Sequence, residues 1–234
     1  YDYPDTSGRD QSADRLYTRQ YTLNWVNSVK LDESWTLGGG ADWQRDMLDD
    51  SSRSSGVAFP SDADERDNTG LYALAQFDNQ VWQAELSGRS DDNEQFGRHN
   101  TWQTGAGWRF VEDYRLSARY GTGFRAPSFN DLYYPGSGNP DLKPEESKSH
   151  ELMLDGQTAG VEWRLTGYRN DFEQMIQWAP DSQGMWTPQN VGKARIEGVE
   201  LEGEFETGWL SHRVSAEYKD PKDKATDKQL QLIS

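Results

Sequence analysis

Apolar and polar residues alternate along the stretch 101–122. Trp102 and Trp108 occupy one set of alternate positions, and Gln103 occupies the other. Successive side chains of a strand point to opposite faces, so this period of two predicts a strand with one apolar and one polar face. A short polar break at 112–113 separates two such runs, and runs so close together predict a β-hairpin.

The same unit recurs along the chain and predicts about ten antiparallel strands, each long enough to cross a bilayer when tilted. Outer-membrane barrels have short periplasmic turns and long extracellular loops. We therefore expect an all-β fold, an antiparallel transmembrane β-barrel fragment, with short turns on one side and long loops on the other. The expected short turns lie near residues 32, 79, 113, 158 and 208, and the expected long loops at 48–66, 90–99, 124–145, 172–192 and after 219.

Composition fits a barrel with a wet interior. The chain has 24 Lys and Arg against 40 Asp and Glu, a net charge of -16, which argues against a nucleic-acid partner because phosphate binding needs a basic surface. Only 33% of the residues are hydrophobic, and a barrel needs apolar residues only on its outer face. There is no cysteine, which excludes disulfides and thiolate metal sites.

The residues indicate no catalytic centre and no metal centre. The three histidines are far apart in the sequence, and no nucleophile–base pair is visible. The acidic clusters at 62–67 and 91–94 do not have the spacing of a calcium loop, so solvated acidic loops are favoured over metal sites. Glu200, Glu202 and Glu204 share one face of a strand, which suits a water-filled lumen.

Large aromatic residues in the predicted loops are the candidate ligand-binding residues. Tyr133, Tyr134, Trp178 and Trp186 lie on the two longest aromatic loops, and Asn130 accompanies them. Amphipathic rings on long loops can hold a bulky ligand. The alternative is that the rings pack the loops together or belong to an aromatic girdle at the membrane surface.

Several stretches carry a family resemblance. The stretch GFRAPSFNDLYYPGSGNPDLKPEESKSHEL resembles a pattern of the TonB-dependent outer-membrane receptors, siderophore receptors included. RSDDNEQFGRHNTWQTGAGW, GYRNDFEQMI and GKARIEGVE are similar more narrowly to the cobalamin (vitamin B12) receptors of that family. With ADWQRD and RDNTGLY, the resemblance covers nearly the whole chain; the stretches are 123–152, 89–108, 167–176, 192–200, 41–46 and 66–72.

The resemblance implies import of cobalamin across the bacterial outer membrane, powered by TonB, and no enzymatic activity. Such receptors have a plugged barrel of roughly 22 strands. Residues 1–234 would then be a partial barrel without the plug domain that contacts TonB and without the last strands. The lack of an initial Met and of a signal peptide also leads us to expect a piece of a longer chain.

The expected partners are cobalamin, TonB through the missing plug domain, and outer-membrane lipid. The resemblance makes calcium possible, on residues that are not in this piece, and implies no covalent cofactor. Two alternatives stay open: a ferric-siderophore receptor of the same family, and a soluble secreted β-sandwich that binds glycans through its loop aromatics.

Overall fold

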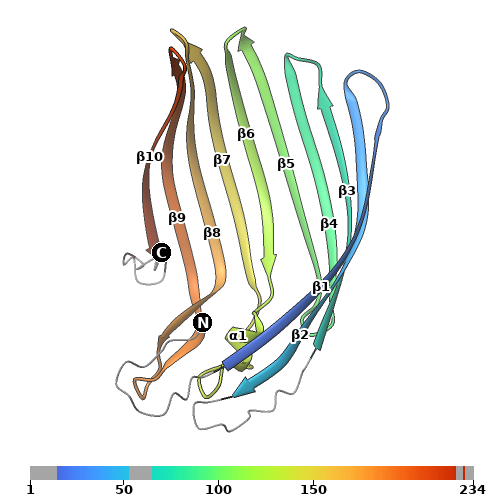
Figure 1. Ribbon diagram of the computed structural model, residues 1–234, viewed down its shortest axis with the longest axis vertical. Coiled ribbons are helices and arrows are strands. Elements are labelled where there is room, and N and C mark those ends of the chain that lie inside the picture. Colours follow the sequence, from blue (N-terminus) through green and yellow to red (C-terminus); the bar gives the residue numbers. More distant parts are fainter. Residues whose placement is uncertain (1–14, 53–64, 225–228, 230–234) are drawn as a thin grey trace.

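The computed structural model describes residues 15–52, 65–224 and 229. In this part of the chain ten strands form one antiparallel sheet, in which each strand pairs with its neighbours in chain order (Figure 1). The elements are Arg15–Lys30 (β1), Trp35–Ser52 (β2), Glu65–Asp78 (β3), Trp82–Asn93 (β4), Gly97–Val111 (β5), Tyr114–Arg125 (β6), Phe129–Tyr133 (α1), Glu145–Thr158 (β7), Val161–Pro180 (β8), Trp186–Thr207 (β9) and Leu210–Asp223 (β10).

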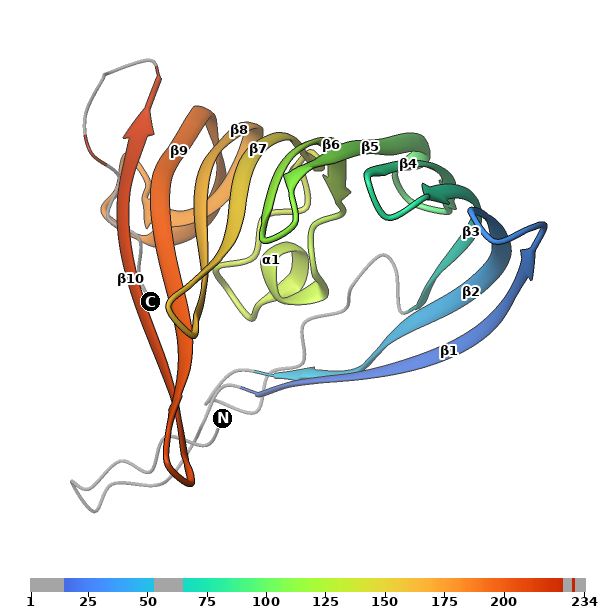
Figure 2. The ribbon, with the colours of Figure 1, turned by 90° about the horizontal axis from the view of Figure 1, so that it is seen from above.

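The sheet is curved, and α1 lies on its concave side (Figure 2). Arg66 of β3 binds the segment that carries α1, through the carbonyl oxygen of Pro127 at 2.9 Å. The face that presents Arg66 is therefore the concave face, which corresponds to the lumen of a barrel. The ladder register then assigns every other strand residue to the lumenal or the outward face, because the faces alternate along each strand.

The two faces differ sharply in chemistry. One register line on the outward face joins Trp82, Trp108, Leu116, Leu154, Leu165 and Leu201. The neighbouring line on the lumenal face joins Gln83, Gly107, Ser117, Met153, Thr166 and Glu200. The predicted faces of the central hairpin are confirmed: outward are Trp102, Ala106, Trp108, Leu116, Ala118 and Tyr120, and lumenal are Gln103, Arg109, Arg115 and Arg119.

Two rows of aromatic side chains border the outward apolar band. The turn-side row, at the short-turn end, includes Trp82 and Trp108, whose rings stack 5.5 Å apart. The loop-side row includes Trp102 and Tyr120, with ring centroids 4.8 Å apart. Aromatic girdles at both membrane interfaces are typical of outer-membrane barrels. The full rows are Trp35, Phe77, Trp82, Trp108, Phe110, Tyr114 and Trp163, and Trp25, Trp43, Trp102, Tyr120, His150 and Tyr218.

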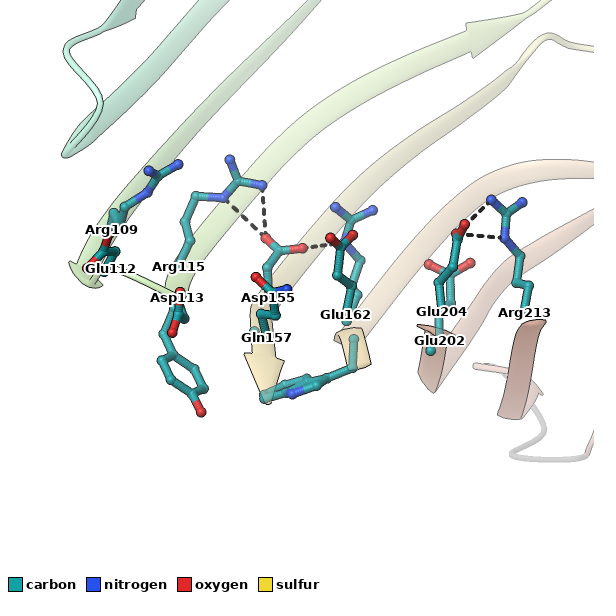
Figure 3. A pocket seen from close by; sticks show the side chains of 15 residues that line it. Arg109, Glu112, Asp113, Arg115, Asp155, Gln157, Glu162, Glu202, Glu204 and Arg213 are labelled. Atoms are coloured by element: carbon teal, nitrogen blue, oxygen red, sulfur yellow. Dashed lines mark hydrogen bonds and ion pairs between the residues drawn. The ribbon is translucent and has the colours of Figure 1, made fainter. Parts of the chain in front are cut away.

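The lumenal face near the short turns is a charged wall around an open cavity of about 620 Å³ (Figure 3). Asp155 accepts hydrogen bonds from Arg115 Nη2 at 3.1 Å and from Arg164 Nε at 2.6 Å. Arg213 Nη2 donates to Glu204 at 2.9 Å. The ladder register places the glutamates of β9 on this lumenal face.

The described residues have little buried apolar packing, because a barrel wall faces lipid on one side and water on the other. The buried hydrophobic residues are Leu48, Phe129, Leu132, Leu142, Met153 and Ala194. Half of them lie in the segment 126–144, which joins β6 to β7. Dense packing is thus concentrated where this segment folds into the lumen.

The predicted fold is confirmed, but two of the expected long loops are wrong. Residues 94–96 form a tight turn between β4 and β5, and residues 181–185 form one between β8 and β9. Two others have different bounds, because β2 and β3 extend into 48–66, of which 53–64 lie outside the described residues, and β10 runs to Asp223. The strands run on past the loop-side row, where water replaces lipid and an apolar outward face is no longer required. Ladder hydrogen bonds and ion pairs hold these polar strand ends, so their sequence has no clear alternation.

The sheet is open at β1 and β10. Within the described residues β1 pairs with β2 alone, and β10 pairs with β9 and makes one isolated bridge, from Lys222 to Gln229. Unpaired backbone groups cost several kcal/mol each in lipid, so we expect both edges to pair with further strands in the membrane. None of the described helices is long and apolar enough to span a membrane.

Candidate ligand-binding site

The segment 126–144 folds inward at the loop end and forms the mouth of the curved sheet together with the tip of the β8–β9 hairpin. Its short helix α1 begins with a capping box. Ser128 Oγ accepts from the backbone N–H of Asp131 at 3.2 Å, and the Asp131 carboxylate accepts from the N–H of Ser128 at 3.0 Å. This reciprocal pair satisfies helix N–H groups that would otherwise lack partners.

Arg66 anchors one side of this segment. Its side chain is only 7% exposed and forms an ion pair with Asp46 at 3.2 Å. The guanidinium also lies over the rings of Phe129, at 5.1 Å, and Phe96, at 5.7 Å. A buried charge needs such partners, and the contact with Phe129 ties α1 to the barrel wall.

The tip of the β8–β9 hairpin holds the other side. Asn190 accepts from the N–H of Lys143 at 2.8 Å and donates to the Lys143 carbonyl at 2.9 Å. Asn139 Nδ2 donates to the carbonyl of Pro188 at 2.9 Å. The segment 126–144 is therefore a bridge across the mouth, fastened to β3 at one side and to the β8–β9 tip at the other.

A cavity of about 500 Å³ lies beside this bridge. Asn130 and Tyr134 line it, together with Arg66, Phe129 and Gln20. Its size falls within the range of small-molecule sites, and it combines aromatic surface with a few convergent polar groups. This arrangement suits binding of a large ligand through rings and hydrogen bonds.

The structure brings four of the five predicted site residues together. Asn130 and Tyr134 line the cavity, and Tyr133 accepts a hydrogen bond from Gln95 at 3.1 Å. Tyr134 and Trp178 meet edge to face, with centroids 5.7 Å apart and planes at 89°. Trp186, the first residue of β9, is 56% exposed and is not among the residues that line the 500 Å³ cavity.

Loop packing therefore accounts for part of what these aromatic residues do. Tyr134 and Trp178 join the two halves of the mouth, while Trp186 presents its ring to solvent. Sequence reasoning missed Arg66 and Phe129, because a single arginine in a polar stretch carries no pattern. The capping box at 128–131 was a readable signal for an ordered turn there.

No group of His, Cys, Asp or Glu that could hold a metal ion occurs among the described residues. The acids at 91–94 have protein partners: Asp91 accepts from Arg89 at 2.6 Å and from Asn68 at 2.9 Å. The acidic cluster at 62–67 lies partly outside the described residues, because residues 62–64 are not described.

At the edge of the mouth, a hydrogen bond from Arg125 to Glu145 raises the pKa of the Arg125 guanidinium.

The fold and the site together define a class of protein. An outward apolar band lies between two aromatic rows, the lumenal face is charged, and a folded segment crosses the mouth. These are features of a transmembrane β-barrel of the outer membrane. In such barrels short turns are periplasmic, which places the bridge on the extracellular side.

The family model described as "TonB dependent receptor-like, beta-barrel" matches residues 1–234, and the chain belongs to this family. The chain is 44% identical over 223 residues to the "Vitamin B12 transporter BtuB" of Photobacterium profundum, which covers 94% of this chain and 36% of the relative. It is 44% identical over 214 residues to the protein of the same name from Vibrio vulnificus, covering 91% of this chain and 34% of the relative. The chain thus spans about a third of these transporters.

Solved structures share the fold at lower identity. The siderophore receptor PirA from Pseudomonas aeruginosa matches with a TM-score of 0.75 at 21% identity, over 90% of this chain and 44% of that one. At this identity the likeness concerns the fold alone. The family match and this shared fold assign the chain to the outer-membrane receptor barrels.

Proposed function

We propose that this chain is part of a receptor that binds cobalamin and imports it across the outer membrane. The observation that carries the proposal is the 44% identity to vitamin B12 transporters over 94% of the chain. The receptor catalyses no covalent step, and its work is binding and transport. Its partners are cobalamin, outer-membrane lipid, and TonB through a plug domain, and nucleic acid is not among them.

The mouth supplies a suitable receiving surface. Cobalamin presents a broad ring system with amide groups at its rim, and such a ligand needs flat aromatic contacts and a few hydrogen bonds. We propose that Asn130, Tyr133, Tyr134, Trp178 and Trp186 help to receive it. Any calcium site of the receptor would lie on residues outside this chain.

Alanine replacements test these residues in the complete receptor that contains this segment. Each of the five variants should bind cobalamin more weakly in an equilibrium titration, while the amount of folded receptor stays constant. Trp209→Ala is a matched control, because Trp209 is 91% exposed in the short turn between β9 and β10, at the opposite end of β9 from the mouth. Unchanged affinity in all five variants would reduce these side chains to loop packing.

The ferric-siderophore alternative is separated by competition. Cobalamin binding to the complete receptor should persist when ferric siderophores are added in large excess. Displacement of cobalamin by a ferric siderophore at comparable concentration would reverse the assignment. The soluble β-sandwich alternative has no support in an open, single-layer sheet with an apolar convex face.

A further inference from the structure

The outward face carries a groove that the import function does not use. A cavity of about 680 Å³ lies over the bilayer-facing parts of β6–β10, between Leu152, Val199 and Tyr218. Leu152 is 56% exposed, Val199 50% and Tyr218 72%. At Gly167, which also lines the groove, an added Cβ would meet nothing within 4 Å. Because Gly167 has no side chain, the space above it is open, and no neighbouring atom packs against it.

A cluster of cations stands at the loop end of this groove. Arg169 lines the groove, and its Nε donates to Asp171 at 2.8 Å. Arg195 Nε at 2.9 Å and Lys224 Nζ at 3.2 Å donate to the same carboxylate. Glu197 lies farther away, at 3.7 Å from Arg169 and from Arg195. Three cations thus share two carboxylates, Asp171 and the more distant Glu197, so the cluster keeps an excess of one positive charge in a chain of net charge -16. Asp220, which also lines the groove, is paired with Lys222 at 2.7 Å.

The cluster keeps donors available for a ligand. Both arginines bind Asp171 through Nε, and among the described residues the terminal amino groups of Arg169 make no hydrogen bond. Asp171 lies beyond the loop-side row, outside the membrane-spanning part of β8. Burial raises the pKa of Asp171, but the hydrogen bonds from Arg169, Arg195 and Lys224 lower it well below its usual range. The carboxylate therefore stays ionised and holds the cations in place.

The groove and the cluster together have the layout of a lipid site. The apolar groove lies between the two aromatic rows, at the depth of acyl chains, and the cations lie just beyond the loop-side row, at headgroup depth. Neighbouring strands are about 4.8 Å apart, so cations on β8, on β9 and directly after β10 spread over about 10 Å. This spread fits a headgroup with more than one ionised phosphate, and the loop side faces the outer leaflet.

We propose that this groove and the cation cluster bind one molecule of the phosphorylated glycolipid of the outer leaflet. Its phosphates engage the guanidiniums of Arg169 and Arg195 and the ammonium of Lys224. An acyl chain lies along the groove over Gly167. Bidentate contacts between arginine and phosphate supply the selectivity, because they require the free terminal amino groups.

The test is a titration of the complete receptor, in detergent, with bis-phosphorylated lipid A, read by native mass spectrometry. The double variant R169Q/R195Q should bind about 30-fold more weakly, from the loss of two basic groups at a membrane surface. Arg213→Gln is the matched control, since Arg213 lies on the lumenal face and pairs with Glu204 at 2.9 Å. It should bind as the wild type does.

A second pair of variants, Gly167→Leu and Gly88→Leu, tests the groove. Gly167→Leu should weaken lipid A binding by filling the groove. Gly88→Leu should not, because Gly88 lies on the same outward face and also has nothing within 4 Å of an added Cβ. Each variant is checked for folding by circular dichroism before the titration.

Two further titrations of the wild-type receptor with other lipids test the proposal even if a variant fails to fold. Dephosphorylated lipid A should bind the wild-type receptor as weakly as lipid A binds the double variant, and phosphatidylglycerol should fail to displace lipid A at equal concentration. Equal binding of phosphorylated and dephosphorylated lipid A would overturn the proposal. So would equal losses in R169Q/R195Q and Arg213→Gln, or displacement by phosphatidylglycerol.

Discussion

The band between the aromatic rows and the mouth beyond it are held together by different forces. In the band, strand after strand repeats the same ladder, and apolar side chains such as Ala106 and Leu116 point outward from the sheet rather than into a core. In the mouth, single side chains such as Arg66 and Asn190 join segments that are distant in the sequence. The band should therefore respond to the polarity of a substitution, and the mouth to the loss of one specific partner.

The largest effect is expected in the band. Ala106→Arg places a charge on the lipid face between the two aromatic rows and should cost about 2 to 4 kcal/mol of folding free energy. Gln103→Arg, on the lumenal face of the same strand, should cost little. The measurement is reversible unfolding of the complete receptor in bilayers. Equal losses for the two variants would mean that the faces are assigned wrongly.

In the mouth, Arg66→Ala should cost about 2 kcal/mol, because Asp46 loses the cation of its ion pair and the Pro127 carbonyl loses a donor. Arg98→Ala is the comparison, since its pair with Asp92 is 67% and 61% exposed and such pairs contribute about 0 to 1 kcal/mol. Denaturant titration of the two variants measures both values. A loss for Arg66→Ala no larger than for Arg98→Ala would show that the anchor is not needed.

A smaller effect is expected where the bridge meets the hairpin tip. The edge-to-face contact of Tyr134 and Trp178 should give a coupling free energy of about 0.5 to 1.5 kcal/mol in a double-mutant cycle with alanine. The cycle compares unfolding of the two single variants and the double variant. Strict additivity would mean that the rings do not stabilise each other.

The smallest effect belongs to the short turns. Ala159 has a φ of 53° and Gly160 a φ of 82°, the left-handed pair of a two-residue hairpin turn. Asn tolerates this region better than Ala, so Ala159→Asn should raise stability by about 0.5 kcal/mol. Ser211→Asn, at a β10 position, serves as the control and should give no gain. A loss of stability in Ala159→Asn would contradict the turn geometry.

The alternation along 101–122 was enough to predict the strands, their faces and their antiparallel order, because lipid and water impose a period of two on every crossing. The same reasoning failed at 90–99 and 172–192. Those residues pair as strand ends in water, where neither face must be apolar. Polar composition there could not distinguish a loop from an extended ladder, and it did not reveal that Asp91 and Asn93 are buried.

The mouth was predicted only in part. Its aromatic residues were recognisable, and the structure gathers four of the five predicted site residues around the bridge. The partners that hold them were not, since Arg66 lies 61 positions from Pro127, and no local pattern encodes a contact at that separation. Trp186 shares the residue type and the predicted loop of Trp178 but lies at the exposed end of β9.

The central claim, that the extracellular mouth of this barrel segment receives cobalamin, is tested most directly by hydrogen exchange on the complete receptor. Adding cobalamin should slow amide exchange in 126–144 and in the β8–β9 tip at 176–190. Exchange in the short turns at 112–113 and 159–160 should stay as it is. Protection confined to other parts of the receptor, or equal protection at the mouth and at the short turns, would contradict the account.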